Sequence, residues 1–95
     1  MKYEERISLY KKAIKQWGAE TQCMIGIEEC AELIKALCKM NRAKDGKSYN
    51  KRLMLLQYEI ADVDIMIEQL KVLFDTSEIE HCKNQKLKRL KELLM

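Results

Sequence analysis

The chain has 95 residues, of which 47% are hydrophobic and 35% charged, with three glycines and no proline. A chain of this length forms one small domain with a thin core, and the scarcity of turn-forming residues excludes a β-sandwich or β-barrel. Eighteen basic and fifteen acidic residues leave a formal charge of +3, which is too mild to predict nucleic-acid binding from charge alone.

The cysteines and the N-terminal segment indicate the compartment. None of the four cysteines belongs to a C-x-x-C pair, and the one histidine, His81, adjoins Cys82. These spacings argue against a structural zinc site. The first residues contain no apolar leader segment, and no apolar run reaches about 18 residues. We therefore expect a reduced, cytoplasmic protein with no membrane partner.

Hydrophobic periodicity predicts four helices. Apolar residues at alternating steps of four and three predict the first helix over residues 3–17, and Gly18 ends or bends it. A second helix is expected over about 19–42, followed by a polar loop over 43–49. Asn50 is the expected N-cap of a third helix that ends near residue 74. Ser77 and Glu80 match a capping box that opens a fourth helix over 77–94.

Four helices with short connections predict an all-α, four-helix bundle that spans residues 1–95 as a single domain. Apolar residues cover two sides of the second and third helices, which is more than one chain of four helices can bury. We therefore expect a homodimer or homotetramer to complete the core. The fourth helix has five basic residues around its apolar stripe, which we interpret as a solvated outer face. They are Lys83, Lys86, Lys88, Arg89 and Lys91.

Carboxylates occupy positions where core residues are expected. At about 100° per residue, Glu59 falls in the middle of the apolar band of the third helix, and Asp62 lies at its edge. In the second helix, Glu29 lies among apolar positions, with Glu32 beside it. An ionised carboxylate is costly to bury without a partner, so it shifts its pKa or finds a cation.

Counting outward from the polar loop places Glu32 level with Glu59, to within about 1.5 Å along the helix axis. The same count places Glu29 level with Asp62. The four carboxylates therefore converge on one layer of two antiparallel helices.

Ligands that are all oxygen favour a hard cation, Mg²⁺ or Mn²⁺ as its substitute. Three basic residues follow Glu32 along the helix and are placed to bind a polyphosphate tail. They are Lys35, Lys39 and Arg42. The alternative is a structural ion-pair network, although two lysines cannot balance four acids.

Residues 28–32, EECAE, match the pattern E-E-x-x-E, and residues 59–62, EIAD, match E-x-x-D, with 26 residues between the two motifs. In this order and spacing the chain resembles the MazG-like, all-α nucleoside triphosphate pyrophosphohydrolases, which are relatives of the dimeric dUTPases. The resemblance covers residues 10–74, and its main motif region is 17–74.

The resemblance implies Mg²⁺-dependent hydrolysis of a nucleoside triphosphate between its α- and β-phosphates, as nucleotide-pool housekeeping. The metal ligands that it implies are Glu29, Glu32, Glu59 and Asp62. Glu28 would lie outside these ligands or orient the attacking water. Trp17 would stack on the base, unless it belongs to the apolar seam of the first helix. Members of this family usually form dimers or tetramers.

Two other classes of protein stay open. A non-enzymatic helical interaction protein, such as an antitoxin-like dimer, would pair Glu59 with a cation of a partner chain, and Mg²⁺ would change nothing. A nucleic-acid binder that uses the basic last helix would show steeply salt-dependent binding.

Overall fold

The computed structural model describes residues 1–42 and 46–95, and within these ranges it contains four helices and no strand. They are α1 (Tyr3–Trp17), α2 (Ala19–Asn41), α3 (Gly46–Leu73) and α4 (Thr76–Leu94). The predicted all-α class and the prediction of four helices are confirmed. Residues 43–45 of the predicted loop lie outside the described residues, and residues 46–49 are helical.

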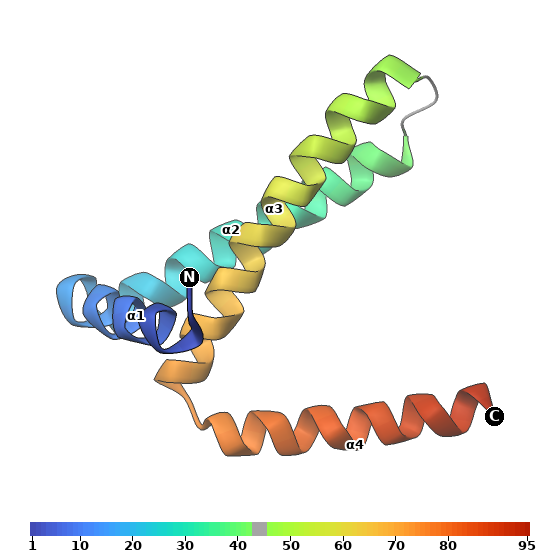
Figure 1. Cartoon of the computed structure of the whole chain (residues 1–95). Helices are drawn as coiled ribbons and strands as arrows, with labels where there is room; N and C mark the ends of the chain where they lie inside the picture. The colour runs from blue at the N-terminus through green and yellow to red at the C-terminus, as the bar shows by residue number, and fades with distance from the viewer. Residues whose placement is uncertain (43–45) are drawn as a thin grey trace.

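The helices form an open arrangement around one antiparallel hairpin (Figure 1). α2 and α3 pack along each other, and α1 lies across them, in contact with both. Within the described residues, α4 contacts only α3, near their junction, and then projects away from the hairpin.

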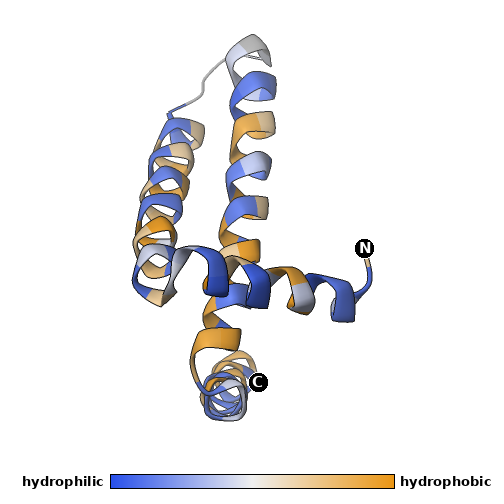
Figure 2. Ribbon diagram, turned by 90° about the vertical axis from the view of Figure 1, so that its left-hand side faces the viewer, coloured by the Kyte–Doolittle hydropathy of each residue, from blue (hydrophilic) through white to orange (hydrophobic). Residues whose placement is uncertain are grey.

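This arrangement gives the chain a thin core. Among the described hydrophobic residues, only four are less than a tenth exposed, namely Tyr10, Ala36, Leu56 and Met66. Figure 2 shows apolar residues distributed along α2 and α3, and many of their large side chains are exposed. A single chain therefore leaves most of its apolar helix faces uncovered.

The predicted start of the third helix is wrong. α3 begins at Gly46, so Asn50 lies inside the helix instead of capping it. Residues 46–49 contain no proline, and their polarity is typical of a loop. Solvent-facing helical turns have the same polarity, so hydrophobic periodicity could not detect this first turn.

The predicted capping box of the fourth helix is also wrong. Asp75 is the N-cap, and its carboxylate accepts a hydrogen bond from the backbone N–H of Glu78 at 3.1 Å. The Ser77 hydroxyl donates to the same carboxylate at 2.7 Å, from inside the first turn. Glu80 instead pairs with Lys71 of α3 at 2.7 Å. Asp and Ser are nearly equal as N-caps, so N-cap preference alone gives Ser77 no advantage over Asp75, two residues earlier.

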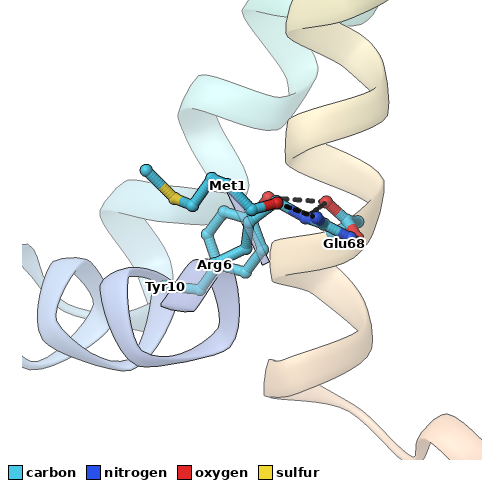
Figure 3. A network of polar contacts seen from close by, with 4 residues as sticks. All are labelled: Met1, Arg6, Tyr10 and Glu68. Carbon is cyan, nitrogen blue, oxygen red and sulfur yellow. Dashed lines mark hydrogen bonds and ion pairs between the residues drawn. The ribbon is translucent and has the colours of Figure 1, made fainter. Parts of the chain in front are cut away.

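A polar network attaches α1 to α3 (Figure 3). The Arg6 guanidinium donates from Nε to Oε1 of Glu68 at 3.0 Å and from Nη2 to Oε2 at 3.1 Å. The buried Tyr10 hydroxyl donates to the same Oε1 at 2.7 Å. Hydrogen bonds from Arg6 and Tyr10 lower the pKa of Glu68. Burial and the bond to Glu68 raise the pKa of Tyr10 to about 12.

We expect the Tyr10→Phe variant to show what this network contributes. The folded state holds the phenol proton more tightly than the unfolded state, so the parent should lose stability as pH rises from 10.0 towards about 12. The variant should lack this component and be less stable at neutral pH by about 1 kcal/mol. Urea unfolding of both proteins near pH 7 and near pH 11 measures the difference. An unchanged pH dependence in the variant would contradict the network.

Gly26 lies in the seam between α2 and α3. A Cβ at Gly26 would lie 3.7 Å from Cε of Met66, which is an ordinary van der Waals contact. Packing therefore leaves room for a methyl group at this position.

Two glycine substitutions should have opposite effects. Gly26→Ala should raise the free energy of unfolding by about 0.5–1 kcal/mol, because alanine has the higher helix propensity. Gly18, at the α1–α2 junction, has a φ of 90°, so Gly18→Ala should lower that free energy by about 1–3 kcal/mol. Thermal melts of the two variants test this, and a destabilised Gly26→Ala would show that the seam is tighter than described.

Candidate metal centre

Three of the predicted carboxylates meet between α2 and α3. Glu29 comes from α2, and Glu59 and Asp62 come from α3, one turn apart on the same face. One carboxylate oxygen of each residue lies within 4.8 Å of the others. All three residues are half-buried, and within residues 1–42 and 46–95 they are the one cluster of potential metal-ligating side chains this close together. We call them the carboxylate triad.

Glu32 and Glu28 lie outside the carboxylate triad. Glu32 is exposed, and its carboxylate is 3.7 Å from the Lys35 ammonium. At about 100° per residue, Glu32 points about 60° further from α3 than Glu29 does. Glu28 is also exposed and belongs to the outer side of α2.

Clustering of these acids changes the protonation of Glu29. Partial burial raises the pKa of Glu29, and the charge of Asp62 and a hydrogen bond to it raise that pKa further, as do the charges of Glu59 and Glu32. The negative charge on the cluster is therefore incompletely balanced by the chain itself. A cation at this position would relieve the repulsion.

A pocket of about 190 Å³ adjoins the carboxylate triad between α2 and α3. Glu59 belongs to both the triad and the pocket wall, so the two features are continuous. The residues that line the pocket are Glu32, Lys35, Ala36, Lys39, Arg52, Leu55 and Glu59. We call it the basic pocket, because three of its side chains are cationic beside the two acids.

Arg52 is the pocket residue that the sequence analysis missed. Its Nη1 donates a hydrogen bond to the backbone carbonyl of Lys39 at 2.7 Å, which ties α3 to the last turn of α2. The sequence spacing could have identified it. Arg52 precedes Glu59 by seven residues and therefore lies two turns away on the same helix face.

Two predicted substrate-binding residues lie elsewhere. Arg42 is the exposed C-cap residue of α2 and does not line the basic pocket. Trp17 is 60% exposed, so it is not a core residue of α1. It lines a separate groove with Tyr10 and Gln69, at the opposite end of the α2–α3 hairpin from Arg42. Neither residue is therefore brought to the carboxylates within one chain.

Comparison with known protein families, with curated proteins and with solved structures finds no match. In the part of the chain that the structure describes, none of the helices combines the length and the apolar character needed to cross a bilayer.

Proposed function

We propose that this chain is a Mg²⁺-dependent nucleoside triphosphate pyrophosphohydrolase of the MazG-like type, acting in the cytoplasm. The observation that supports it most is the carboxylate triad directly beside the basic pocket. In the proposed reaction, water attacks the α-phosphorus and the bond from this atom to the α–β bridging oxygen breaks. A nucleoside monophosphate and pyrophosphate are released.

The donor set of the carboxylate triad fits a hard divalent cation. Its oxygens lie within 4.8 Å of one another, which is compatible with ligands about an ion at roughly 2.0–2.6 Å from each. Glu29, Glu59 and Asp62 would hold Mg²⁺, or Mn²⁺ in its place, with Glu32 as the fourth acid. When bound, the ion would neutralise phosphoryl charge and lower the pKa of bound water.

The chain's own cations would hold the leaving group. Lys39 and Arg52 line the basic pocket and would supply positive charge opposite a β,γ-diphosphate, and Lys35 also lines the pocket. The pocket begins at Glu59, so a diphosphate in it would set the α-phosphate beside the carboxylate triad. Glu28 lies outside this arrangement and takes no part in the proposed binding.

The proposal includes assembly into a homodimer or homotetramer, in which the four-helix bundle is completed by a second copy. The exposed apolar side chains on α2, α3 and α4 support it, because a stable monomer rarely leaves so much apolar surface in water. The proposal has no nucleic-acid partner.

A product assay over a panel of ribo- and deoxyribonucleoside triphosphates tests the reaction. We expect release of pyrophosphate and a monophosphate in Mg²⁺ or Mn²⁺, and none in excess EDTA. Orthophosphate as the product, or cleavage that persists in EDTA, would contradict the proposal. If no nucleotide is cleaved and Mg²⁺ leaves the melting temperature unchanged, the chain is better described as a helical interaction protein.

A further inference from the structure

α2 carries a second apolar stripe on the side that faces away from α3. We call it the outer stripe, and its residues are Met24, Ile27, Ala31, Ile34 and Cys38. At about 100° per residue, its centre lies about 160° from the side of α2 that is buried against α3. Ile27 is 63% exposed and Ile34 is 62% exposed, so no other described element covers them. An uncovered stripe of this length indicates a protein partner.

The residue spacing of the outer stripe is that of a helix–helix seam. Its members follow one another at steps of three, four, three and four, which is the repeat of coiled-coil contact positions. Ala31 in the middle lets a second helix approach closely. One flank of the stripe carries Glu28 and Lys35, two turns apart and both exposed, and the other flank carries Cys30 and Leu37.

The charges on the first flank favour, as the partner, the α2 helix of a second copy in antiparallel orientation. In an antiparallel seam, residues of one flank face the same flank of the partner helix. With Ala31 against the partner's Ile34, Glu28 faces the partner's Lys35, and symmetry repeats the pair. A shift of one heptad brings Glu28 to the partner's Glu28 or Lys35 to the partner's Lys35, which repel. A parallel seam would pair each charge with a cysteine or leucine.

We propose that the outer stripe of α2 is the two-fold interface of a homodimer, with two reciprocal Glu28–Lys35 ion pairs across it. The proposal rests on the proposed self-assembly and not on the proposed hydrolysis. The present partner of Lys35 does not oppose it, because the Lys35–Glu32 contact is 3.7 Å long between side chains that are 63% and 52% exposed. Such an exposed ion pair contributes little to the stability of the fold. In the dimer the Lys35 ammonium turns to the partner's Glu28, and Lys39 and Arg52 remain in the basic pocket.

Sedimentation equilibrium at micromolar concentration tests the interface through a charge swap. The parent should be a dimer or a larger assembly. Glu28→Lys alone or Lys35→Glu alone should raise the dissociation constant of this contact by about tenfold or more, because each places like charges at two sites. The double variant should restore the parent value. Residues 28 and 35 do not touch within one chain, so this rescue requires contact between copies. Asp64→Lys, on an exposed position of α3, is the control and should change nothing.

A cross-link provides a second test. Leu37→Cys should form a disulfide with the partner's Cys30 on mild oxidation, and the same variant carrying Cys30→Ser should not. Within one chain the two positions are about 10 Å apart along the helix, too far for a disulfide. A monomeric parent, single reversals without effect, or a double variant that stays weakened would overturn the proposed interface. Far-UV circular dichroism confirms that each variant is folded.

Discussion

Replacing Glu59 by Gln is expected to lower pyrophosphate release by about 10²–10⁴-fold, because one ligand charge is lost where charge stabilisation of the transition state is worth several kcal/mol. The substitution keeps the size of the side chain, so the metal-free fold should survive. Initial rates in saturating Mg²⁺ measure the loss. Gln57→Glu, on an exposed position two residues earlier in α3, is a control that should stay near the parent rate.

The Glu59→Gln variant also distinguishes between two roles of Glu59, as a metal ligand or as part of a structural ion pair. The raised pKa of Glu29 means that the folded, metal-free protein binds a proton more tightly than the unfolded chain. The stability gained from this proton is present below pH 4.5 and is lost as pH rises through the pKa of Glu29 in the folded state. Glu59→Gln removes one of the charges that raise this pKa, so in chelator at neutral pH the variant should be as stable as the parent or more stable.

Urea unfolding in chelator near pH 5 and near pH 7.5 measures this effect as the difference between parent and variant. Only this difference is informative, because three other carboxyl groups have lowered pKa values and make both proteins more stable as pH rises. They are Glu68, Asp75 and Glu80. If Glu59→Gln is several kcal/mol less stable than the parent in chelator, Glu59 pairs with a buried cation and the carboxylates are structural.

Arg52→Ala is expected to lower kcat/KM for pyrophosphate release by about 10–100-fold, because a charge-assisted contact to phosphate is worth about 1.5–3 kcal/mol. Arg42→Ala is the matched control and should stay near the parent value, since Arg42 lies outside the basic pocket. Arg52→Lys should recover only part of the loss, because an ammonium cannot form the bidentate contact.

Arg52 also bonds to the carbonyl of Lys39, so thermal melts must accompany these kinetics. If unfolding fully explains the loss of activity, Arg52 only stabilises the fold and does not bind phosphate. Equal losses in the Arg42 and Arg52 variants would contradict the proposed binding of phosphate in the basic pocket.

The convergence of the acids could be predicted because it depends on local geometry. An antiparallel hairpin fixes which residues of α2 and α3 share a level, and the counted level of Glu29 with Asp62 agrees with the structure. α3 begins five residues before its predicted start, yet Glu29 still meets both Glu59 and Asp62. Periodicity gives the angle of about 60° between Glu29 and Glu32, but it could not show which of the two faces α3, because the direction of α3 as seen from α2 is set by packing.

The placement of α1 and α4 could not be predicted from the sequence. Glu68 reads as a solvent-facing position on α3, yet α1 covers it with Arg6 and Tyr10. Trp17 continues the apolar seam of α1 and is nevertheless 60% exposed. These outcomes depend on contacts between residues distant in sequence, and a hydrophobic pattern states only that a face is apolar and not which element covers it. The same limit applies to α4, which within the described residues contacts only α3 and leaves most of its apolar stripe exposed.

Electron paramagnetic resonance of Mn²⁺ tests most directly whether Glu29, Glu59 and Asp62 bind a divalent cation. Titration of the parent should reduce the signal of free Mn²⁺, and excess Mg²⁺ should restore it. Glu59→Gln should bind Mn²⁺ about tenfold more weakly or worse, because a charged ligand is lost. If the free Mn²⁺ signal is the same with the parent, with the variant and without protein, the carboxylate triad is not a metal site and the proposed hydrolase is contradicted.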